Sequence, residues 1–568
     1  MKGCLGEIEG LGFGKVWKYM KDIIVQKYKV KQLWKWCEDG LFAIPEIQRE
    51  FVWDVKKACK LLDSIYRQLP IGSLLIWETG ADPQNLLRHA QNILPEFNYR
   101  NKRIWFLIDG QQRLSVLHRV KKGGSVINYN DKEVDFDHLC FSFDKRFDIR
   151  FIKIRRPISN LHIPMVSILG HNWRNKLRYL SKKKFTEIEK FRNLLKDYEV
   201  PAILINMGNL EDVRESFLRI NSGGLRISAA DQAFTRASRL NLRHLVNDLR
   251  TNLPNGFNQI DRGIIQFAAA LILGEREVGG RAVESALMKT EKREFQAGKV
   301  SKHFSRKWRE ISECIRKAVD YLSTEIGLPN FDFLPSENML ATLSFFFYAN
   351  NRAQPLSNQK HELWKWFWAT AVAGRYVGRG YRQNILKDVK FFESLGKRRK
   401  GRFVFHDLVP RSEIKRIDYL TASGLTTAFF FLLCKREPLY LETGSRIPLG
   451  EAASPGNRKD KHHIFPKALL QRNDFSPKQA NSLCNICYVV AEENQSIGSN
   501  KPRVYLAKYK KRKQFARVMK SHLIPYKSDS GLWSKNIKKG YRRFQVQRLE
   551  VIRKALEKEA GIKLFRED

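Results

Sequence analysis

Short apolar runs alternate with amphipathic segments over roughly the first 235 residues of the chain. Three of these runs have the length and the continuous apolar character of buried strands: residues 73–77 (SLLIW), 102–108 (KRIWFLI) and 202–207 (AILINM). Residues 55–69 have helical spacing up to Pro70, and a second helical repeat of leucine and valine begins at Leu114. The pattern predicts a mixed α/β module.

Long helical patterns replace this alternation between about residues 231 and 436, for example over residues 307–326 and 362–373. Residues 442–459 are rich in Gly, Ser, Pro and Arg, which is typical of a connection into a last module. The chain is therefore predicted to be an α+β multidomain protein. Its expected parts are an α/β domain over residues 20–235, a helical region over residues 236–440 and a C-terminal domain with a basic end over residues 441–568.

The net charge of the chain is strongly positive. Its 568 residues contain 103 Lys and Arg against 59 Asp and Glu, a formal charge of +44. Such a chain repels itself unless a polyanion is nearby, so nucleic acid or an anionic membrane surface is the expected partner. The charge is concentrated at the C-terminal end, because residues 501–568 carry 21 Lys and Arg against 6 Asp and Glu.

Composition excludes several classes of protein. The best apolar stretches, near residues 343–348 and 426–434, are far shorter than the ~20 residues that span a membrane. The first ten residues lack the apolar core of a signal peptide, and the eight cysteines are too scattered for a disulfide framework. A cytoplasmic protein with reduced cysteines and no membrane partner is expected.

Histidine, asparagine and aspartate gather in one C-terminal stretch. It contains DKHHIFP at residues 460–466, LCNIC at 483–487 and NQSIGSNKP at 494–502. Hydrolysis of a phosphodiester at neutral pH needs a base that activates water and a cation that carries charge on the leaving oxygen. His462 and His463 are neighbours on a predicted strand and so point to opposite faces, which allows them to divide these tasks. A histidine pair alone is equally typical of hydrogen-bonded core residues.

The ordered set resembles the HNH (ββα-metal) nuclease motif, in which a His-Ile-x-Pro strand is followed by Asn on a second strand and by His or Asn on a helix. The resemblance covers residues 455–515. It implies that His463 is the general base, that Asn485 orients the loop or ring of that base, and that Mg²⁺ or another divalent cation is the cofactor. The implied metal ligands are His462 and Asn494, supported by Asp460. The last motif position is Asn rather than His, a departure expected to weaken or re-tune metal binding.

Two features near this motif have alternative interpretations. Cys484 and Cys487 form a CxxC pair, but the chain has no second CxxC to complete a structural zinc site, so both are predicted to pack in the core. The basic residues after the motif are either a solvated helix face or a surface that contacts DNA phosphates. Next to a nuclease-like motif the second interpretation is preferred, and its residues are Lys501, Lys510, Lys511, Arg512 and Lys513.

A second group of candidate site residues lies in the α/β module. Residues 109–113 (DGQQR) are expected at the junction of a strand with a helix, where backbone N–H groups and an arginine favour an anion. Arg49 is a second candidate for holding phosphate, and residues 221–224 (NSGG) form a donor-rich turn. Spacing alone favours a structural role, in which the aspartate and the second glutamine cap the helix and the arginine pairs with a carboxylate. No Gly-x₄-Gly-Lys-Ser/Thr sequence is present, so an ordinary P-loop is excluded.

Together with IPEIQREFVWD at residues 44–54 and INSGG at residues 220–224, the DGQQRL sequence resembles the N-terminal domain of the GmrSD family. The resemblance implies a ParB/sulfiredoxin-like fold, which members commonly join through helices to a C-terminal HNH domain. The family comprises modification-dependent (type IV) restriction enzymes and relatives such as the phosphorothioate-sensing SspE proteins, which prokaryotes use against phage DNA. It implies binding and hydrolysis of an NTP at a site formed by Asp109, Gly110, Gln111, Gln112 and Arg113, with Gln48 and Arg49 as neighbours.

The first functional hypothesis is therefore an NTP-regulated, modification-dependent DNA endonuclease or nickase of prokaryotic anti-phage defence, acting on double-stranded phage DNA. One HNH site cuts one strand at a time, so nicking or a homodimer is expected. The alternative is a nucleotide-responsive, ParB-like DNA-binding protein whose HNH domain is inactive. RNA is a further alternative as substrate, because a basic charge and an HNH fold do not by themselves select the sugar.

Overall fold

The chain divides into two compact units, residues 1–243 and residues 244–568. The predicted boundary between a helical region and a C-terminal domain, at residues 440 and 441, lies inside the second unit. The computed structural model describes residues 20–45, 48, 50–80, 93–128, 132–147, 149–158, 160–207, 229–236, 240, 242–296, 302–398, 401–447, 461–489 and 497–568.

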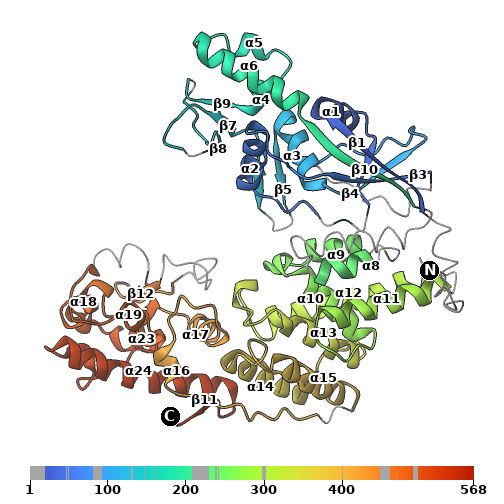
Figure 1. The fold of residues 1–568 in the computed structure, drawn as a ribbon. Coiled ribbons are helices and arrows are strands. Elements are labelled where there is room, and N and C mark those ends of the chain that lie inside the picture. Colours follow the sequence, from blue (N-terminus) through green and yellow to red (C-terminus); the bar gives the residue numbers. More distant parts are fainter. Residues whose placement is uncertain are drawn as a thin grey trace, which may run out of the picture. The chain divides into compact units, whose positions relative to one another are not determined.

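The first unit is built on a five-stranded mixed sheet (Figure 1). Its strands are β1 (Met20–Lys29), β2 (Phe42–Ala43), β3 (Leu74–Thr79), β4 (Ile104–Asp109) and β10 (Glu199–Met207). Their order is β1-β10-β3-β4-β2, in which β1–β10 and β3–β4 are antiparallel pairs while β10–β3 and β2–β4 are parallel pairs. The α+β class predicted from the sequence is confirmed.

Alternate residues of the sheet pack into two separate cores. On one face, Leu74 and Leu107 join a large apolar cluster whose helical residues come mainly from the helices named next. These helices are α1 (Val30–Glu38), α2 (Val55–Tyr66), α3 (Gln111–Lys122) and α6 (Lys182–Asp197). On the opposite face, Leu75, Phe106 and Ile108 belong to a smaller cluster. The continuous apolar runs of the sequence therefore reflect strands that are buried on both faces.

Short elements extend this unit. They are β5 (Ser125–Ile127) with β6 (Glu133–Asp135), the three-stranded sheet of β8 (Phe151–Lys153), β7 (Leu139–Ser142) and β9 (His162–Pro164), and the helices α4 (Met165–Leu169), α5 (Trp173–Lys176) and α8 (Ala229–Arg236). The three strands predicted from apolar runs are confirmed as β3, β4 and β10. The helix predicted over residues 55–69 is α2, which ends earlier because Gln68 adopts a positive φ of 58° before Pro70 is reached.

Gly110 joins β4 to α3 in a conformation that an L-residue adopts only at a cost. Its φ is 92°, and a Cβ atom there would lie 2.4 Å from Cδ2 of Leu74. We expect Gly110→Ala to destabilise the first unit by about 2 kcal/mol or more, since the positive φ and the steric overlap both oppose it. Scanning calorimetry of the full chain measures this loss.

Gly124→Ala is the matched control for that substitution. Gly124 also has a positive φ, 81°, but a Cβ there would meet only Nη1 of Arg119 at 3.7 Å. The free energy of unfolding of Gly124→Ala should therefore fall only by the cost of the positive φ, about 1 kcal/mol. Equal losses in the two variants would show that the close approach of Gly110 to Leu74 contributes nothing.

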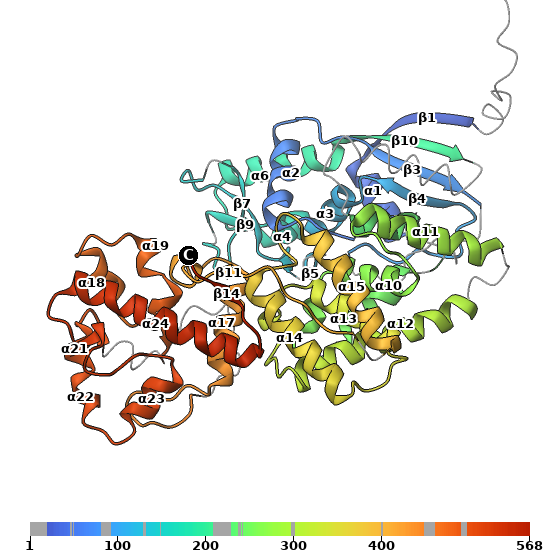
Figure 2. The ribbon, with the colours of Figure 1, turned by 90° about the horizontal axis from the view of Figure 1, so that it is seen from below.

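Helices make up the first part of the second unit, as predicted. They are α9 (Leu242–Thr251), which crosses the boundary between the units, α10 (Arg262–Ile272), α11 (Gly280–Gln296), α12 (Lys302–Thr324), α13 (Asn338–Ala349), α14 (Ser357–Ala373) and α15 (Tyr381–Arg398). Helix α13 is apolar on nearly all sides and contacts α10, α12 and α15 (Figure 2). A helix that is hydrophobic all round needs such a central position.

The C-terminal part of this unit surrounds a short two-stranded ladder. Its elements are α16 (Glu413–Arg416), α17 (Gly424–Lys435), β12 (Lys461–His463), α18 (Lys467–Gln471), α19 (Pro477–Ala480), β13 (Ile486–Tyr488), α21 (Pro502–Tyr505), α22 (Ala507–Lys510), α23 (Phe515–Ser521) and α24 (Ile537–Ala560), with β11 (Val409–Pro410) paired to β14 (Phe565–Arg566). Trp368 of α14 stacks on Phe431 of α17 with ring centroids 5.4 Å apart. Trp364 donates to the Glu559 carbonyl of α24 at 2.6 Å. The helical region and the C-terminal part therefore pack directly against each other.

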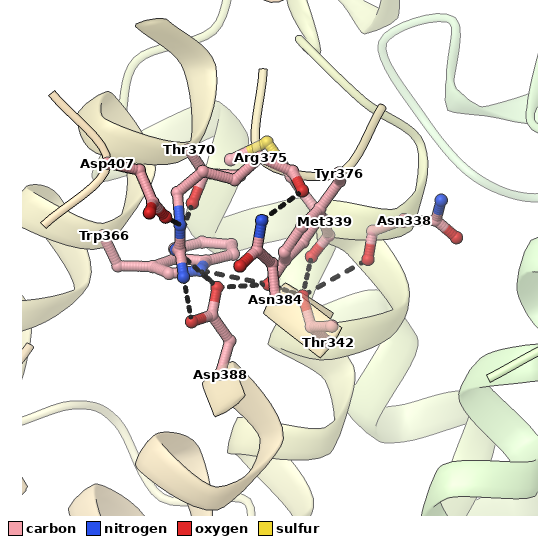
Figure 3. A network of polar contacts seen from close by, with 10 residues as sticks. All are labelled: Asn338, Met339, Thr342, Trp366, Thr370, Arg375, Tyr376, Asn384, Asp388 and Asp407. Carbon is pink, nitrogen blue, oxygen red and sulfur yellow. Dashed lines mark hydrogen bonds and ion pairs between the residues drawn. The ribbon is translucent and has the colours of Figure 1, made fainter. Parts of the chain in front are cut away.

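A buried ion pair fixes the turn after α14 (Figure 3). The Arg375 guanidinium donates to both oxygens of Asp388 in α15, at 2.8 and 2.9 Å. The same carboxylate accepts from Nε1 of Trp366 at 2.9 Å and from the Tyr376 hydroxyl at 2.7 Å. Asp407 lies 3.6 Å from Nε of Arg375 at the edge of this group. Every oxygen of Asp388 therefore has at least one partner, as a buried charge requires.

None of the described helices is both long enough and apolar enough to cross a membrane.

Candidate functional site

The two motif segments of the C-terminal stretch pair as antiparallel strands. β12 and β13 pair residue for residue, with His462 opposite Cys487 and His463 opposite Ile486. Between the two strands the chain forms α18 and α19 and returns through a 3₁₀ turn at Leu483–Asn485. The sequence order histidines, loop, asparagine, second strand is thus brought together in a single small structure.

A row of two hydrogen bonds, from His463 to Asn481 and from Asn481 to Asp418, holds the imidazole of His463. Its Nε2 lies 3.0 Å from Oδ1 of Asn481, and Nδ2 of Asn481 donates to Oδ2 of Asp418 at 3.1 Å. Because a carboxylate only accepts, the amide nitrogen of Asn481 faces Asp418 and the amide oxygen faces the imidazole. His463 therefore carries its proton on Nε2, and in the neutral ring Nδ1 is the nitrogen that accepts.

The surroundings of His463 favour its neutral form. Burial lowers its pKa below the ordinary value of 6.5, and Lys467 lowers it as well. The hydrogen bond that its Nε2–H donates to Asn481 and the charge of Asp418 raise this pKa in part. The ring of Tyr419 lies edge-on to the imidazole at 5.8 Å. A neutral imidazole with one nitrogen fixed as donor is suited to accept a proton at pH 7.

Asn481 and Asp418 were not among the residues predicted from the sequence. Asp418 lies 63 residues before Asn481 and outside the motif. Backbone hydrogen bonds hold the two segments together, since Tyr419 N–H donates to the Asn481 carbonyl at 3.0 Å. The sequence contains no pattern that relates a residue before α17 to the turn after α19, so only the tertiary structure identifies this pair.

We expect Asp418→Ala to slow any reaction that uses His463 as a base. The variant loses the group that orients Asn481, and loss of such a partner costs roughly tenfold to a hundredfold at metal-binding histidines. Asp418 also raises the pKa of His463, so its removal should lower that pKa further and move the acidic limb of the pH–rate profile to lower pH. The measurement is kcat and KM of cleavage as a function of pH.

Asp418→Asn separates orientation from charge. An asparagine at position 418 still presents an oxygen to Asn481, so most of the rate should return while the acidic limb stays shifted. Asp474→Ala, which removes an exposed carboxylate paired with Lys538, is the control for loss of a negative charge. Wild-type rates and pH profiles in both Asp418 variants would rule out a role for this row.

Asn485 fixes the backbone that follows β12. It is fully buried, its Oδ1 accepts from Phe465 N–H at 2.8 Å, and its Nδ2 donates to the carbonyls of Phe465 and Ala480, each at 2.9 Å. Phe465 is two residues after His463 and Ala480 is next to Asn481. Asn485 is therefore a positioning residue that holds both sides of the histidine, in line with the orienting role that the motif implies.

Arg548 of α24 binds the backbone of the same turn. Its guanidinium is completely buried and donates to the carbonyls of Cys484 at 3.1 Å and Ile486 at 2.7 Å, which flank Asn485. It also donates to the carbonyls of Leu523 and His522, at 3.2 and 3.0 Å. A long helix at the end of the chain is thus fastened to the motif through backbone oxygens, which sequence reasoning did not detect.

Part of the predicted metal site lies within the described residues. His462 is 4% exposed, and its ring is edge-on to Tyr505 at 6.4 Å. Asp460 and Asn494 lie outside the described residues. Where the structure is described, no group of three or more His, Cys, Asp or Glu side chains is arranged to hold a metal ion. The predicted donors are nonetheless chemically compatible with a divalent cation, because carboxylate and amide oxygens suit Mg²⁺ or Mn²⁺ and imidazole suits transition ions.

The two cysteines of the CxxC pair are core residues. Cys484 is fully buried and Cys487 is 3% exposed, and both are free thiols. Burial raises the pKa of Cys484 to about 12. This environment agrees with the packing role predicted for both residues.

The basic run after the motif differs in exposure from residue to residue. Lys501, Lys511 and Lys513 are exposed. Lys510 lies over the ring of Trp533 at 4.6 Å, and Arg512 forms an ion pair with Glu442. The charge of Arg512 is therefore already compensated within the protein, whereas the exposed lysines remain candidates for phosphate contacts.

The DGQQR motif lies at the predicted junction, between β4 and α3. Gly110 is the N-cap and no side chain caps the helix, so Asp109 and Gln112 do not have the capping role considered above. Gln112 instead binds the preceding motif, since its Oε1 accepts from Val52 N–H at 2.9 Å and its Nε2 donates to the Glu50 carbonyl at 3.0 Å. The two N-terminal motifs are thus joined directly.

Gln48 and Arg113 also use their polar atoms inside this domain. Gln48 is 5% exposed and donates to the carbonyls of Leu107 and Ile108 in β4. Arg113 donates from one nitrogen to Asp109 at 2.9 Å and to the Ser73 carbonyl at 2.6 Å, while its buried Nε–H has no partner among the described residues.

Gln111 is 2% exposed. Arg49 and the turn at residues 221–224 lie outside the described residues. The nucleotide site therefore stays a prediction, with the Nε–H of Arg113 as a donor that a ligand would satisfy.

Two comparisons with known proteins bear on this arrangement. A protein of Methanocaldococcus jannaschii, named only as uncharacterized, is 24% identical over 525 residues, which cover 82% of this chain and 84% of the relative. Residues 24–237 match the family model described as "GmrSD restriction endonuclease, N-terminal domain". That span runs from β1 to just beyond α8 and includes both N-terminal motifs. The N-terminal part of this chain is therefore similar to the N-terminal domain of GmrSD restriction endonucleases.

Proposed function

We propose that this protein is a DNA endonuclease or nickase of prokaryotic anti-phage defence, with its hydrolytic site in the C-terminal, HNH-like part of the chain. The observation that carries the proposal is the pair of hydrogen bonds in which Nε2 of His463 is held by Asn481 and Asn481 is held by Asp418. The similarity of residues 24–237 to a restriction endonuclease domain and the net charge of +44 support DNA as the partner.

In the proposed reaction, Nδ1 of His463 accepts a proton from water, and the resulting hydroxide attacks phosphorus in line with the departing 3′ oxygen. The new P–O bond leaves a 5′ phosphate, and the 3′ oxygen takes a proton from solvent. Asn481 keeps Nε2 of His463 as a donor throughout, so the ring gains a proton only at Nδ1. The residues that would hold Mg²⁺ or another divalent cation are His462 and Asn494, with support from Asp460. That ion supplies charge stabilisation to the transition state and the leaving oxygen.

We further propose that an NTP regulates the enzyme and is hydrolysed at residues 109–113. Support comes from the family similarity and from the unpartnered Nε–H of Arg113 beside a strand-to-helix junction. Gln112 connects this junction to residues 50–53, so a ligand that moves it would also move the IPEIQREFVWD segment. NTP binding would in this way be communicated within the N-terminal domain.

Dependence on DNA modification is proposed from the same family similarity. The test is plasmid cleavage with a divalent cation on three substrates: unmodified DNA, DNA with glucosylated hydroxymethylcytosine and DNA with phosphorothioate linkages, each with and without NTP. Cleavage of one modified substrate and not of the unmodified plasmid is the expected result. A nicked product would indicate a single active site, and a linear product would indicate a homodimer.

Binding without cleavage of any substrate would instead favour the ParB-like DNA-binding protein with an inactive HNH domain. Equal cleavage of modified and unmodified plasmids would support the nuclease activity and contradict its dependence on DNA modification. A matched RNA duplex serves as the control for the sugar, and its cleavage at the same rate would contradict a DNA-specific enzyme.

A further inference from the structure

A basic cavity opens beside the row that holds His463. Its volume is about 620 Å³, and its walls come from three segments that are far apart in sequence: α16, α19 with the residues before it, and α24 (Figure 1). The polar side chains that matter here are Lys415, Arg416, Lys478, Gln479, Arg542 and Gln545. The volume lies within the range of ligand-binding sites, about 300–1,000 Å³.

The charge of this cavity is almost wholly positive. Four of its lining residues are cations and none is an acid. Arg416 pairs with Glu413 at 3.2 Å on the surface, whereas Lys415, Lys478 and Arg542 have no acidic partner among the residues that the structure describes. Four cations around one cavity, with a single surface ion pair among them, favour a ligand that carries negative charge.

The cavity fits a sugar–phosphate backbone better than a nucleotide base. Phe475 is the one aromatic residue that lines it, and this ring is 8% exposed and packed edge-to-face on Tyr541 with centroids 4.9 Å apart. No aromatic face is therefore offered to a base from the described walls. Lysine and arginine side chains on separate segments are suited to several phosphates along a strand.

The position of the cavity relates it to the proposed catalytic histidine. Arg416 is two residues before Asp418, and Gln479 is two residues before Asn481, so each wall continues into one member of the row. The Ile417 carbonyl accepts from Leu483 N–H at 3.3 Å, which ties the two segments together at this point. Two residues span at most about 7 Å, and each strand of a duplex carries one phosphate per roughly 3.4 Å of helix axis.

We propose that this cavity binds backbone phosphates of the DNA strand within a few nucleotides of the bond that is cut. The proposal rests on the proposed DNA cleavage at His463 and gives it a substrate-binding subsite. This subsite lies apart from the basic run at residues 510–513. Its cations position the strand without reading its sequence.

The test measures binding of a DNA duplex to the full chain in the His463→Ala background, where no cleavage interferes. The double variant Lys478→Ala/Arg542→Ala is compared with Lys554→Ala/Lys558→Ala, which removes two exposed lysines of α24 away from the cavity. Fluorescence anisotropy over a range of salt concentrations gives the affinity and its salt slope. Loss of two phosphate contacts should reduce the slope by about 1.8 and the affinity roughly tenfold, whereas the control pair should change the affinity less than about twofold.

The outcomes separate this proposal from the proposed function. Equal affinities in the two double variants, with normal cleavage by the wild type, would overturn phosphate binding in the cavity and leave the proposed nuclease activity supported. Weaker binding by the cavity variant, together with a wild type that cleaves no DNA, would support DNA binding in the cavity and overturn the proposed nuclease activity. Displacement of the duplex by inorganic phosphate at matched ionic strength would assign the site to a free anion and overturn binding of a DNA backbone.

Discussion

The His463→Ala variant is expected to lose DNA cleavage while its affinity for DNA stays within a few-fold of the wild type. Loss of a general base costs roughly 10²–10⁴-fold in rate, enough to reduce the product to the background of a plasmid assay. The side chain is partly buried and its recorded polar contact is with Asn481, so its removal should leave the fold intact. Single-turnover nicking rates and anisotropy titrations measure the two quantities.

Two controls make this result specific. His406→Ala removes an exposed histidine of the same unit and should leave the rate unchanged. Added imidazole should restore part of the activity of His463→Ala by taking the place of the lost ring, and should have no effect on a variant that fails for structural reasons. Cleavage by His463→Ala at the wild-type rate would remove His463 from the mechanism.

The second large effect is on stability. Asp388→Ala leaves the guanidinium of Arg375 buried, with its side chain only 5% exposed, and removes the acceptor of Trp366 and Tyr376. Breaking a buried pair by removing one partner costs about 3–5 kcal/mol. We expect the opening free energy of α14 and α15 to fall by that amount, as measured by hydrogen exchange of their backbone amides.

Asp407→Ala is the matched control for this prediction. Asp407 approaches the same guanidinium at 3.6 Å, but its side chain is 55% exposed. An exposed partner contributes about 0–1 kcal/mol, so amide protection should change little. Equal losses in the Asp388 and Asp407 variants would show that burial does not set the strength of this network.

Local pattern predicts the framework of the first unit well. The apolar runs at residues 73–77 and 102–108 correspond to β3 and β4, because strands buried on both faces are continuous in apolar character. Periodicity also predicts the helices α12 and α14, but not their starts, since each begins five residues before the predicted position. Periodicity does not predict the order of the sheet, in which β10 inserts between β1 and β3 although it lies far away in sequence.

The candidate site was predictable only in part. Short-range order predicts His463 and Asn485 as site residues, and the structure brings them close together through the pairing of β12 with β13. Asn481 and Asp418 lack a sequence signal because their relation to His463 depends on contacts between distant segments. Arg548 could not be predicted for the same reason, since it binds backbone carbonyls, which every residue type carries.

The glutamines and the arginine of the N-terminal motifs illustrate a different limit. Residue types suited to an anion are equally suited to holding loops, and Gln48 and Gln112 bind backbone groups of neighbouring segments. Arg113 pairs with Asp109, as the structural interpretation of the motif expected, and keeps its Nε–H for a further acceptor. Spacing along the chain does not distinguish these uses.

The most direct test of the account is the conversion of supercoiled plasmid by purified wild-type protein, with a divalent cation or with EDTA, beside His463→Ala. The substrate is the modified plasmid that the wild type prefers. The account predicts nicked or linear product only for the wild type with the cation. Product in the presence of EDTA, or from the His463→Ala protein at the wild-type rate, would contradict a metal-dependent nuclease that uses His463 as its base.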